Sequence, residues 1–244
     1  MARRRGGDKL FKKEKEKRDF EREKAKKEVV KSVIIACEDS VSSPTYFQMI
    51  IDKLIEIKKI TPNSVVIVPH DSSTNPTGVL NNLKSYKKDG VDWKEFEHKW
   101  IVIDRDKEYK GGGHSTEDFN NALNNAKSRR KDLHVDVAYA NDSFELWYLL
   151  HFEYRNTPIM RDEIIEKVIE KLKGTEPHIF SKLTKENIKN ENYSKHIFNT
   201  LEKFQENAIE NAKKLLASYG DSHNPECDNP STNIFELVMI LNNM

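Results

Sequence analysis

The sequence predicts an α/β fold with a central, mainly parallel sheet. Short aliphatic runs such as "SVIIAC", "SVVIV" and "WIVI" recur along the first 140 residues, and the segments between them space their apolar residues as a helix does. Strands of continuous aliphatic residues that alternate with helices are typical of a parallel sheet covered on both faces. After residue 141 only helical patterns remain, so we expect a helical C-terminal region packed on that core.

The first half of the predicted core is one strand, one helix and a repeat of that pair. The first strand covers 32–38, and its apolar run ends at Glu38. A helix over 43–57 follows, with Ser43 as the N-cap and Pro44 in the first turn, where both residue types are common. The second strand and the second helix are expected at 64–70 and 76–86.

The second half of the core begins with a strand that ends in acidic residues. This third strand covers 99–106, and Asp104 and Asp106 close it. The next helix, over 115–129, begins with a cap at Ser115 or Thr116. The remaining segments are a fourth strand at 134–140, a strongly apolar and buried helix at 142–152, and further helices at 161–174, 194–220 and 229–244.

The amino-acid composition limits the classes of protein to which the chain can belong. Hydrophobic residues make up 36% and charged residues 33% of the 244, which is typical of a soluble chain with a modest core. No apolar run approaches the ~20 residues that span a bilayer, and no apolar stretch follows the N-terminal charges as in a secretory signal. Cys37 and Cys227 form neither a disulfide framework nor a zinc spacing, so we expect a cytoplasmic protein.

The N-terminal segment differs from the rest of the chain in charge. Residues 1–31 carry 14 Lys or Arg against 7 Asp or Glu, whereas the remainder carries 27 against 33. We expect a basic arm, partly disordered or helical, before an α/β core over 32–140 and the helical region over 141–244. The tip of this arm is a candidate contact for a nucleic-acid backbone: Arg3, Arg4 and Arg5. A solubilising tail or a partner-docking arm explains the same charges.

Three acids are expected at one edge of the sheet. In an open parallel sheet, ligands lie outside the carboxyl ends of the strands, where Glu38, Asp104 and Asp106 are predicted. If the first and third strands are neighbours, these carboxylates converge and need a cation. Oxygen ligands of this kind suit Mg²⁺ or Mn²⁺. An Asp-X-Asp by itself also occurs in sugar-nucleotide transferases, in aspartyl-nucleophile phosphatases and in surface loops.

Four segments resemble the RloB-like (AbiLii) family of anti-phage proteins. The order of the acids resembles, more broadly, the Toprim domain of topoisomerases, primases and overcoming-lysogenization-defect nucleases. The segments are "IIACEDSVSSPTYF", "VIDRD", "VAYANDSFELWYLLHF" and "NPSTNIFELVMIL". The match spans nearly the whole chain after Lys31, and "FELWYLLHF" is its most specific part. Asp39 and Ser40 stand where the family usually has Gly-Glu, so the second acid of that motif is not assured.

The resemblance implies a Toprim-like Rossmannoid core and a metal site. Asp104 and Asp106 would bind Mg²⁺ or Mn²⁺, and Glu38 would ligate the metal or act as a general base. Glu145 would complete a second metal site, or would instead be a buried acid paired with Lys or Arg. Paired metals stabilise both the attacking and the leaving oxygen in phosphodiester cleavage.

Other polar residues near these acids have two interpretations each. Arg105 and Lys107 flank the acids and would contact a substrate phosphate, or would only face solvent. His151 is expected to be a hydrogen-bonded core histidine rather than a catalytic acid. Asn141 is expected to cap the helix that follows it, with a substrate contact as the alternative.

These implications favour a metal-dependent nuclease that acts in abortive infection. RNA is the expected substrate, with tRNA preferred and DNA second, and an ABC- or AAA-type ATPase is the expected controlling partner; a homo-oligomer is left open. One alternative is a non-catalytic Toprim-fold sensor or assembly subunit of a defence complex, which the departure at Asp39 and Ser40 supports. Another is a phosphotransferase or phosphatase with Asp104 as nucleophile. Such enzymes usually have Thr or Val after the Asp-X-Asp, whereas this chain has Lys107.

Overall fold

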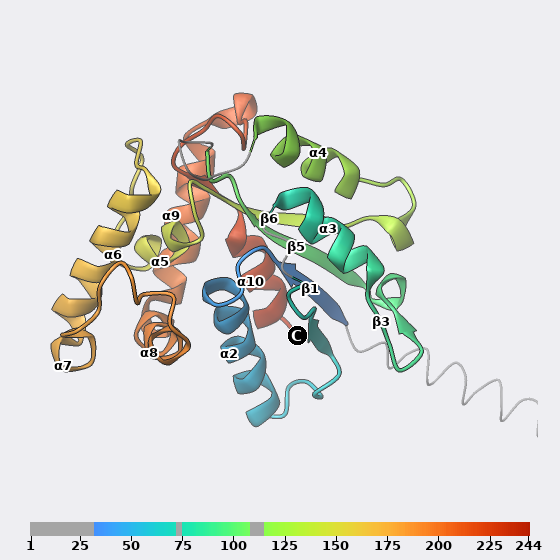
Figure 1. The fold of residues 1–244 in the computed structure, drawn as a ribbon, viewed down its shortest axis with the longest axis horizontal. Helices are drawn as coiled ribbons and strands as arrows, with labels where there is room; N and C mark the ends of the chain where they lie inside the picture. Colours follow the sequence, from blue (N-terminus) through green and yellow to red (C-terminus); the bar gives the residue numbers. More distant parts are fainter. Residues whose placement is uncertain (1–31, 72–74, 108–114) are drawn as a thin grey trace, which may run out of the picture.

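The computed structural model describes residues 32–71, 75–107 and 115–244, which form helices around a five-stranded sheet (Figure 1). The strands are β1 (Val33–Cys37), β2 (Val65–Ile67), β5 (His98–Asp104), β6 (Asp136–Asn141) and β7 (Ser231–Thr232), in the order β2-β1-β5-β6-β7. All neighbouring pairs are parallel except β6 and β7. The predicted α/β class with a mainly parallel sheet is therefore confirmed, and it is consistent with a Rossmann-like core.

The first and third predicted strands are neighbours, as the convergence of the acids requires. β1 pairs with β5 in parallel, from Val33 opposite His98 to Cys37 opposite Val102. The Glu38 backbone N–H then donates to the Val102 carbonyl at 2.9 Å. Both strands therefore end at the same edge of the sheet, and the residues that follow them emerge side by side.

Helices cover both faces of the sheet (Figure 1). Alternate residues of β1 point to opposite faces, so that Ile34 lies in one hydrophobic cluster and Ile35 in the other. α3 and α4 cover the first face, and α2, α5 and α10 cover the second, with α6, α8 and α9 packed around α5 and α2. The helices are α2 (Ser42–Glu56), α3 (Pro76–Ser85), α4 (Thr116–Ala126), α5 (Glu145–Phe152), α6 (Arg161–Thr175), α7 (Pro177–Phe180), α8 (Glu191–Leu201), α9 (Gln205–Ala217) and α10 (Ile234–Asn242).

The helix boundaries in the structure agree only in part with those predicted from the sequence. Ser115 caps α4 as predicted, because its hydroxyl accepts from the Asp118 N–H at 3.1 Å. The predicted cap at Ser43 is wrong: the Asp39 carboxylate accepts from the Val41 N–H at 2.9 Å and from the Ser43 N–H at 3.1 Å. The helix predicted over 194–220 is two helices, α8 and α9, joined by a 3₁₀ turn that neither Gly nor Pro marks.

The C-terminal region also contributes to the sheet, which the sequence did not indicate. β7 pairs with the end of β6, and the Asn233 side chain continues that edge. Its amide oxygen accepts from the Tyr139 N–H, and its amide nitrogen donates to the Val137 carbonyl, both at 2.8 Å. A small hairpin, β3 (Lys87–Lys88) with β4 (Val91–Asp92), was likewise not predicted.

Two further expectations concern the chain as a whole. The basic arm over 1–31, with Arg3, Arg4 and Arg5, lies outside the described residues. In the part that the structure describes, no helix combines the length and the apolar character that crossing a membrane requires. The division at residues 32–140 and 141–244 stays a prediction, although the second segment supplies β7 to the sheet of the first.

Replacing Asn233 by Ala tests how much this side chain stabilises the β6 edge. The substitution removes the partners of the Tyr139 N–H and the Val137 carbonyl, so we expect a loss of about 1–3 kcal/mol in the free energy of unfolding. Urea unfolding followed by circular dichroism measures it. The matched control is the exposed Asn243→Ala, for which we expect less than about 0.5 kcal/mol. Equal losses in the two variants would contradict this role.

Candidate active site

Glu38 and Asp104 meet at the carboxyl ends of β1 and β5. The Asp104 backbone N–H donates to the Glu38 carboxylate Oε2 at 2.9 Å. Burial raises the pKa of Asp104 well above its ordinary value, and the nearby charges of Glu38 and Glu145 raise it further. The predicted convergence of these two acids is therefore present, and Asp104 binds a proton more readily than a surface carboxylate does.

Glu145, the first residue of α5, faces the same group of acids. Its side chain is fully buried, accepts from the Ser42 hydroxyl at 3.1 Å and lies 3.5 Å from the Lys189 ammonium. Burial favours its neutral form, but the positive charges of Lys189 and Arg161 outweigh burial and hold its pKa below the ordinary value. Glu145 is therefore a buried carboxylate paired with a lysine, and it also lies within electrostatic reach of Asp104.

Asp106 is turned toward a cation rather than toward Glu38. Its backbone has a φ of +29°, uncommon for a residue other than glycine, and its carboxylate accepts from Arg161 Nη1 at 2.6 Å. The same Arg161 charge also acts on Glu145 and Asp104. Arg161 therefore connects the two parts of the acidic group, and it begins α6 in the helical region.

Asp142 fixes this arrangement, although the sequence analysis did not single it out. Its carboxylate accepts from the Lys107 N–H at 3.0 Å and from the Arg161 N–H at 3.1 Å, and its carbonyl accepts from the Asp106 N–H at 2.9 Å. The turn after β5 is thus tied to the start of α6. Asn141, expected to cap α5, instead ends β6 and donates to the Pro225 carbonyl at 3.1 Å.

Asp39 contacts the backbone at the start of α2 and also lies within electrostatic reach of the acidic group. Its carboxylate accepts from the N–H of Val41, just before α2, from the N–H of Ser43 and from the Ser43 hydroxyl. Its negative charge also acts on Asp104 and on Lys189.

The residues fit a hard divalent cation in their chemistry but are not arranged as a ready site. Every candidate ligand is a carboxylate, the donor type that Mg²⁺ and Mn²⁺ prefer, and both Glu145 Oε2 and Asp106 Oδ1 are buried without a hydrogen-bond partner. However, no three His, Cys, Asp or Glu side chains among residues 32–71, 75–107 and 115–244 are grouped so that they could hold a metal ion. Arg161 and Lys189 supply the balancing charge instead.

The two residues expected to contact a phosphate lie in different environments. Arg105 is only 3% exposed; its Nη2 donates to the Thr116 hydroxyl at 2.9 Å, and the guanidinium lies 3.4 Å from Glu226. The alternative expectation, that Arg105 only faces solvent, is therefore wrong, and its contact with a substrate phosphate stays a prediction. Lys107 is exposed and lines a cavity of about 270 Å³ with Arg105 and Asp142, so its nucleic-acid contact stays a prediction.

His151 is a core histidine, as expected. It is fully buried, its Nδ1 donates to the Trp147 carbonyl at 2.8 Å, and its Nε2 accepts from the Tyr46 hydroxyl at 3.1 Å. Burial lowers the pKa of His151 to about 4, so the ring is neutral at physiological pH. This pattern leaves the imidazole no role at the acidic group.

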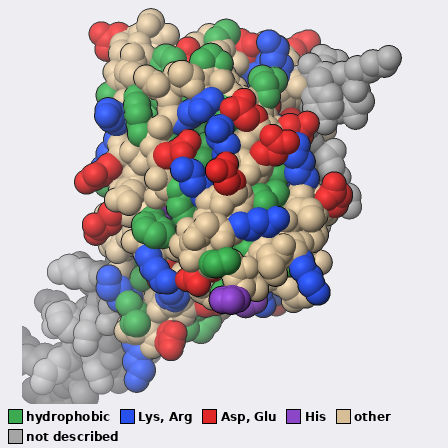
Figure 2. Space-filling view, turned by 90° about the vertical axis from the view of Figure 1, so that its left-hand side faces the viewer, with side chains coloured by type: hydrophobic (Ala, Val, Ile, Leu, Met, Phe, Trp, Pro, Cys, Tyr) green, Lys and Arg blue, Asp and Glu red, His purple; other side chains and the backbone are tan. Residues whose placement is uncertain are grey.

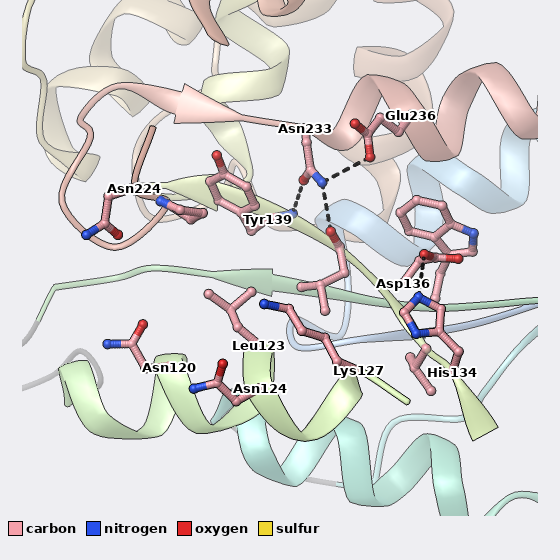
Figure 3. Close-up of a pocket in the computed structure, with 14 residues that line it drawn as sticks. Asn120, Leu123, Asn124, Lys127, His134, Asp136, Tyr139, Asn224, Asn233 and Glu236 are labelled. Atoms are coloured by element: carbon pink, nitrogen blue, oxygen red, sulfur yellow. Dashed lines mark hydrogen bonds and ion pairs between the residues drawn. The ribbon is translucent and has the colours of Figure 1, made fainter. Parts of the chain in front are cut away.

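A cavity of about 420 Å³ lies along the outer edge of β6, away from the acids (Figure 3). Polar side chains of α4 face Tyr139, Asn233 and Glu236 across it, and none of the candidate acids lines it. The cavity is therefore separate from the acidic group, whose carboxylates lie at the ends of β1 and β5.

The face that carries α6, α7 and α8 has mixed charge. Figure 2 shows acidic and basic side chains interspersed over this face, without a continuous basic band. Pairs from this region include Lys185 with Glu166 at 2.6 Å and Arg155 with Glu163 at 3.2 Å. The side chains drawn on this face therefore offer no continuous positive patch to a nucleic-acid backbone.

Arg161 and Lys189 are the functional candidates that sequence reasoning missed. Each is one charged residue in a polar, helical segment, and nothing in the sequence separates it from the many other Lys and Arg of that segment. Only the folded arrangement brings them to acids that lie 44 or more residues away in the chain.

Comparison with known proteins gives one match. A family model described as RloB-like protein matches residues 33–241, which is most of the chain. No curated protein and no solved structure matches.

The pKa of His151 predicts a loss of stability in acid. The unfolded imidazole binds a proton near pH 6.5, whereas the folded one stays neutral down to about pH 4, so stability falls as the pH drops between these values. From pH 7 to pH 5 we expect this residue alone to lower the free energy of unfolding by about 2 kcal/mol. Urea unfolding of the wild type and of His151→Gln, compared at both pH values, isolates the contribution. Parallel pH profiles of the two proteins would contradict it.

Proposed function

This chain belongs to the RloB-like family, a membership consistent with a defence-associated protein, and on that premise we propose that it is a metal-dependent nuclease of Toprim type that acts in abortive infection. RNA, and tRNA in particular, is the proposed substrate, with DNA second. The observation that carries the proposal is the meeting of Glu38 and Asp104 at the ends of neighbouring strands, with the buried Glu145 facing them.

The residues proposed to hold Mg²⁺ or Mn²⁺ are Glu38, Asp104 and Asp106, with Glu145 next to them. A bound divalent cation would polarise a phosphate oxygen and lower the pKa of a bound water. Burial and the charges of Glu38 and Glu145 disfavour the charged form of Asp104, and a cation beside it would offset that cost. Asp106 and Glu145 each keep one buried oxygen without a hydrogen-bond partner.

Glu38 is the proposed general base toward the attacking water or hydroxyl. Its carboxylate is oriented by the Asp104 N–H, which donates to Oε2 at 2.9 Å. Glu38 follows a buried strand whose five residues are at most 5% exposed, so its backbone is held rigidly. A base on a rigid strand end keeps its distance to a bound phosphate fixed.

The proposed partner is an ABC- or AAA-type ATPase that controls the nuclease. The resemblance of "FELWYLLHF" and the closing "NPSTNIFELVMIL" to this anti-phage family supports it. Control by a partner also agrees with a site whose acids are paired with internal cations, because such a site needs a change before it binds a metal.

A non-catalytic sensor or assembly subunit is the second candidate. The observation that favours it is the charge balance of the site: Arg161 and Lys189 already neutralise Asp106 and Glu145, and the described residues present no ready three-ligand metal group. Metal-dependent cleavage by the purified chain, alone or with its ATPase, rules this candidate out.

Replacing the strand-end acids tests the nuclease. We expect Glu38→Gln, Asp104→Asn and Asp106→Asn each to reduce cleavage of labelled tRNA in Mg²⁺ or Mn²⁺ by about 100-fold or more, because each removes a metal ligand or the base. The control is Glu210→Gln, an exposed acid on α9. Gel analysis with and without EDTA measures the rate. Cleavage that survives the acid substitutions, or that EDTA does not stop, would contradict this assignment.

A further inference from the structure

Two cations from the helical region face the acids of the strand ends. Arg161 Nη1 lies 2.6 Å from Asp106 Oδ2, and Lys189 Nζ lies 3.5 Å from Glu145 Oε1. Both positive charges also act on Asp104. The two side chains therefore converge on one group of carboxylates from different helical segments, the start of α6 and the segment before α8.

These cations remain open to a ligand, unlike their partners. The side chains of Arg161 and Lys189 are 28% and 34% exposed, whereas those of Asp106 and Glu145 are 12% and 0% exposed. Among the described residues, the Arg161 guanidinium donates one side-chain hydrogen bond, from Nη1. A guanidinium carries five N–H donors, so most of its capacity is available for an anion.

A phosphodiester cannot approach this site without positive charge. Glu38, Asp104, Asp106 and Glu145 repel an anion at short range, and the repulsion is strong where water is excluded. A divalent cation held by the acids offsets part of it. The two side-chain cations supply more, since Arg and Lys are the usual phosphate ligands in proteins.

We propose that Arg161 and Lys189 form the phosphate-binding pair of this site. In the structure they pair with Asp106 and Glu145, and on substrate binding the two side chains would turn to the phosphodiester while the acids would hold a divalent cation. The inference rests on the nuclease proposed above, and it makes the helical region part of the active site rather than a support for it.

The test is the salt dependence of tRNA binding. Affinity of the full chain for fluorescent tRNA is measured by anisotropy in Mn²⁺ on ice, at several salt concentrations, for Arg161→Met and Lys189→Met. We expect each variant to bind about 10-fold more weakly and to lose about one unit from the slope of log K against log salt. A residue that only supports the fold would leave that slope unchanged.

Matched controls are present in the same helical region. Arg155→Met and Lys185→Met remove cations of similar exposure, 22% and 38%, whose carboxylate partners are the surface residues Glu163 and Glu166. Arg161→Lys and Lys189→Arg keep the charge and should retain most of the affinity. Thermal melts identify any variant that fails to fold. If Arg161→Met or Lys189→Met fails to fold, the charge-conserving variant at that position is used instead. For Lys189, the double variant Glu145→Gln/Lys189→Met is used as well.

A second readout is the affinity for Mn²⁺ alone, measured by electron paramagnetic resonance. We expect Arg161→Met to bind Mn²⁺ at least as tightly as the wild type, because the cation that competes for Asp106 is gone. Loss of both Mn²⁺ and tRNA binding in a folded variant would mean that Arg161 only positions the acids, which overturns the inference.

The remaining outcomes separate this inference from the nuclease itself. If the wild type cleaves tRNA while the two variants match Arg155→Met and Lys185→Met in affinity and slope, the phosphate-binding pair is wrong and the nuclease stands. If no protein cleaves tRNA or DNA, even with the ATPase partner present, but the slopes fall as expected, the pair stands and the nuclease is wrong. If the wild type shows no salt-dependent tRNA binding, the pair is overturned.

Discussion

The constraint on which the site depends is the cost of burying several carboxylates together. Glu145 is fully buried and Asp104 is half-buried beside Glu38, and an uncompensated charge in the protein interior costs several kcal/mol. The fold compensates in two ways: Asp104 gains affinity for a proton, and Arg161 and Lys189 bring positive charge to Glu145 and Asp106. Without the buried acids, neither the raised pKa of Asp104 nor the inward-facing Arg161 and Lys189 would be needed. The acids therefore account for the placement of these two cations.

This constraint links the two parts of the chain. The parallel sheet places Glu38 and Asp104 at one edge, and the helical region returns to that edge through α5, the start of α6 and the segment before α8. The Asp142 carboxylate ties the turn after β5 to the backbone of Arg161, so the turn that carries Asp106 and the start of α6 are held next to each other. A separation of the chain into a catalytic core and a passive helical cover therefore does not describe the site.

The sequence predicted the parts of this arrangement that follow from strand topology. Continuous aliphatic runs marked the parallel strands, and the acids after β1 and β5 followed from where such strands end. The contact of Arg161 with Asp106 depends on tertiary packing across more than fifty residues, which no local pattern encodes. The burial of Arg105 was not predicted for the same reason, because its contact with Glu226 is decided by a loop far along the chain.

The most direct test of this account is the structure of the protein in crystals grown with Mn²⁺, with anomalous diffraction to locate the metal. The account predicts a Mn²⁺ peak bound by the carboxylates of Glu38 and Asp104, with Arg161 released from Asp106. The contradicting result is a crystal at saturating Mn²⁺ that shows no metal peak at these acids and keeps the Arg161–Asp106 and Lys189–Glu145 ion pairs. It would show that the acids are a structural cluster and not a metal-dependent active site.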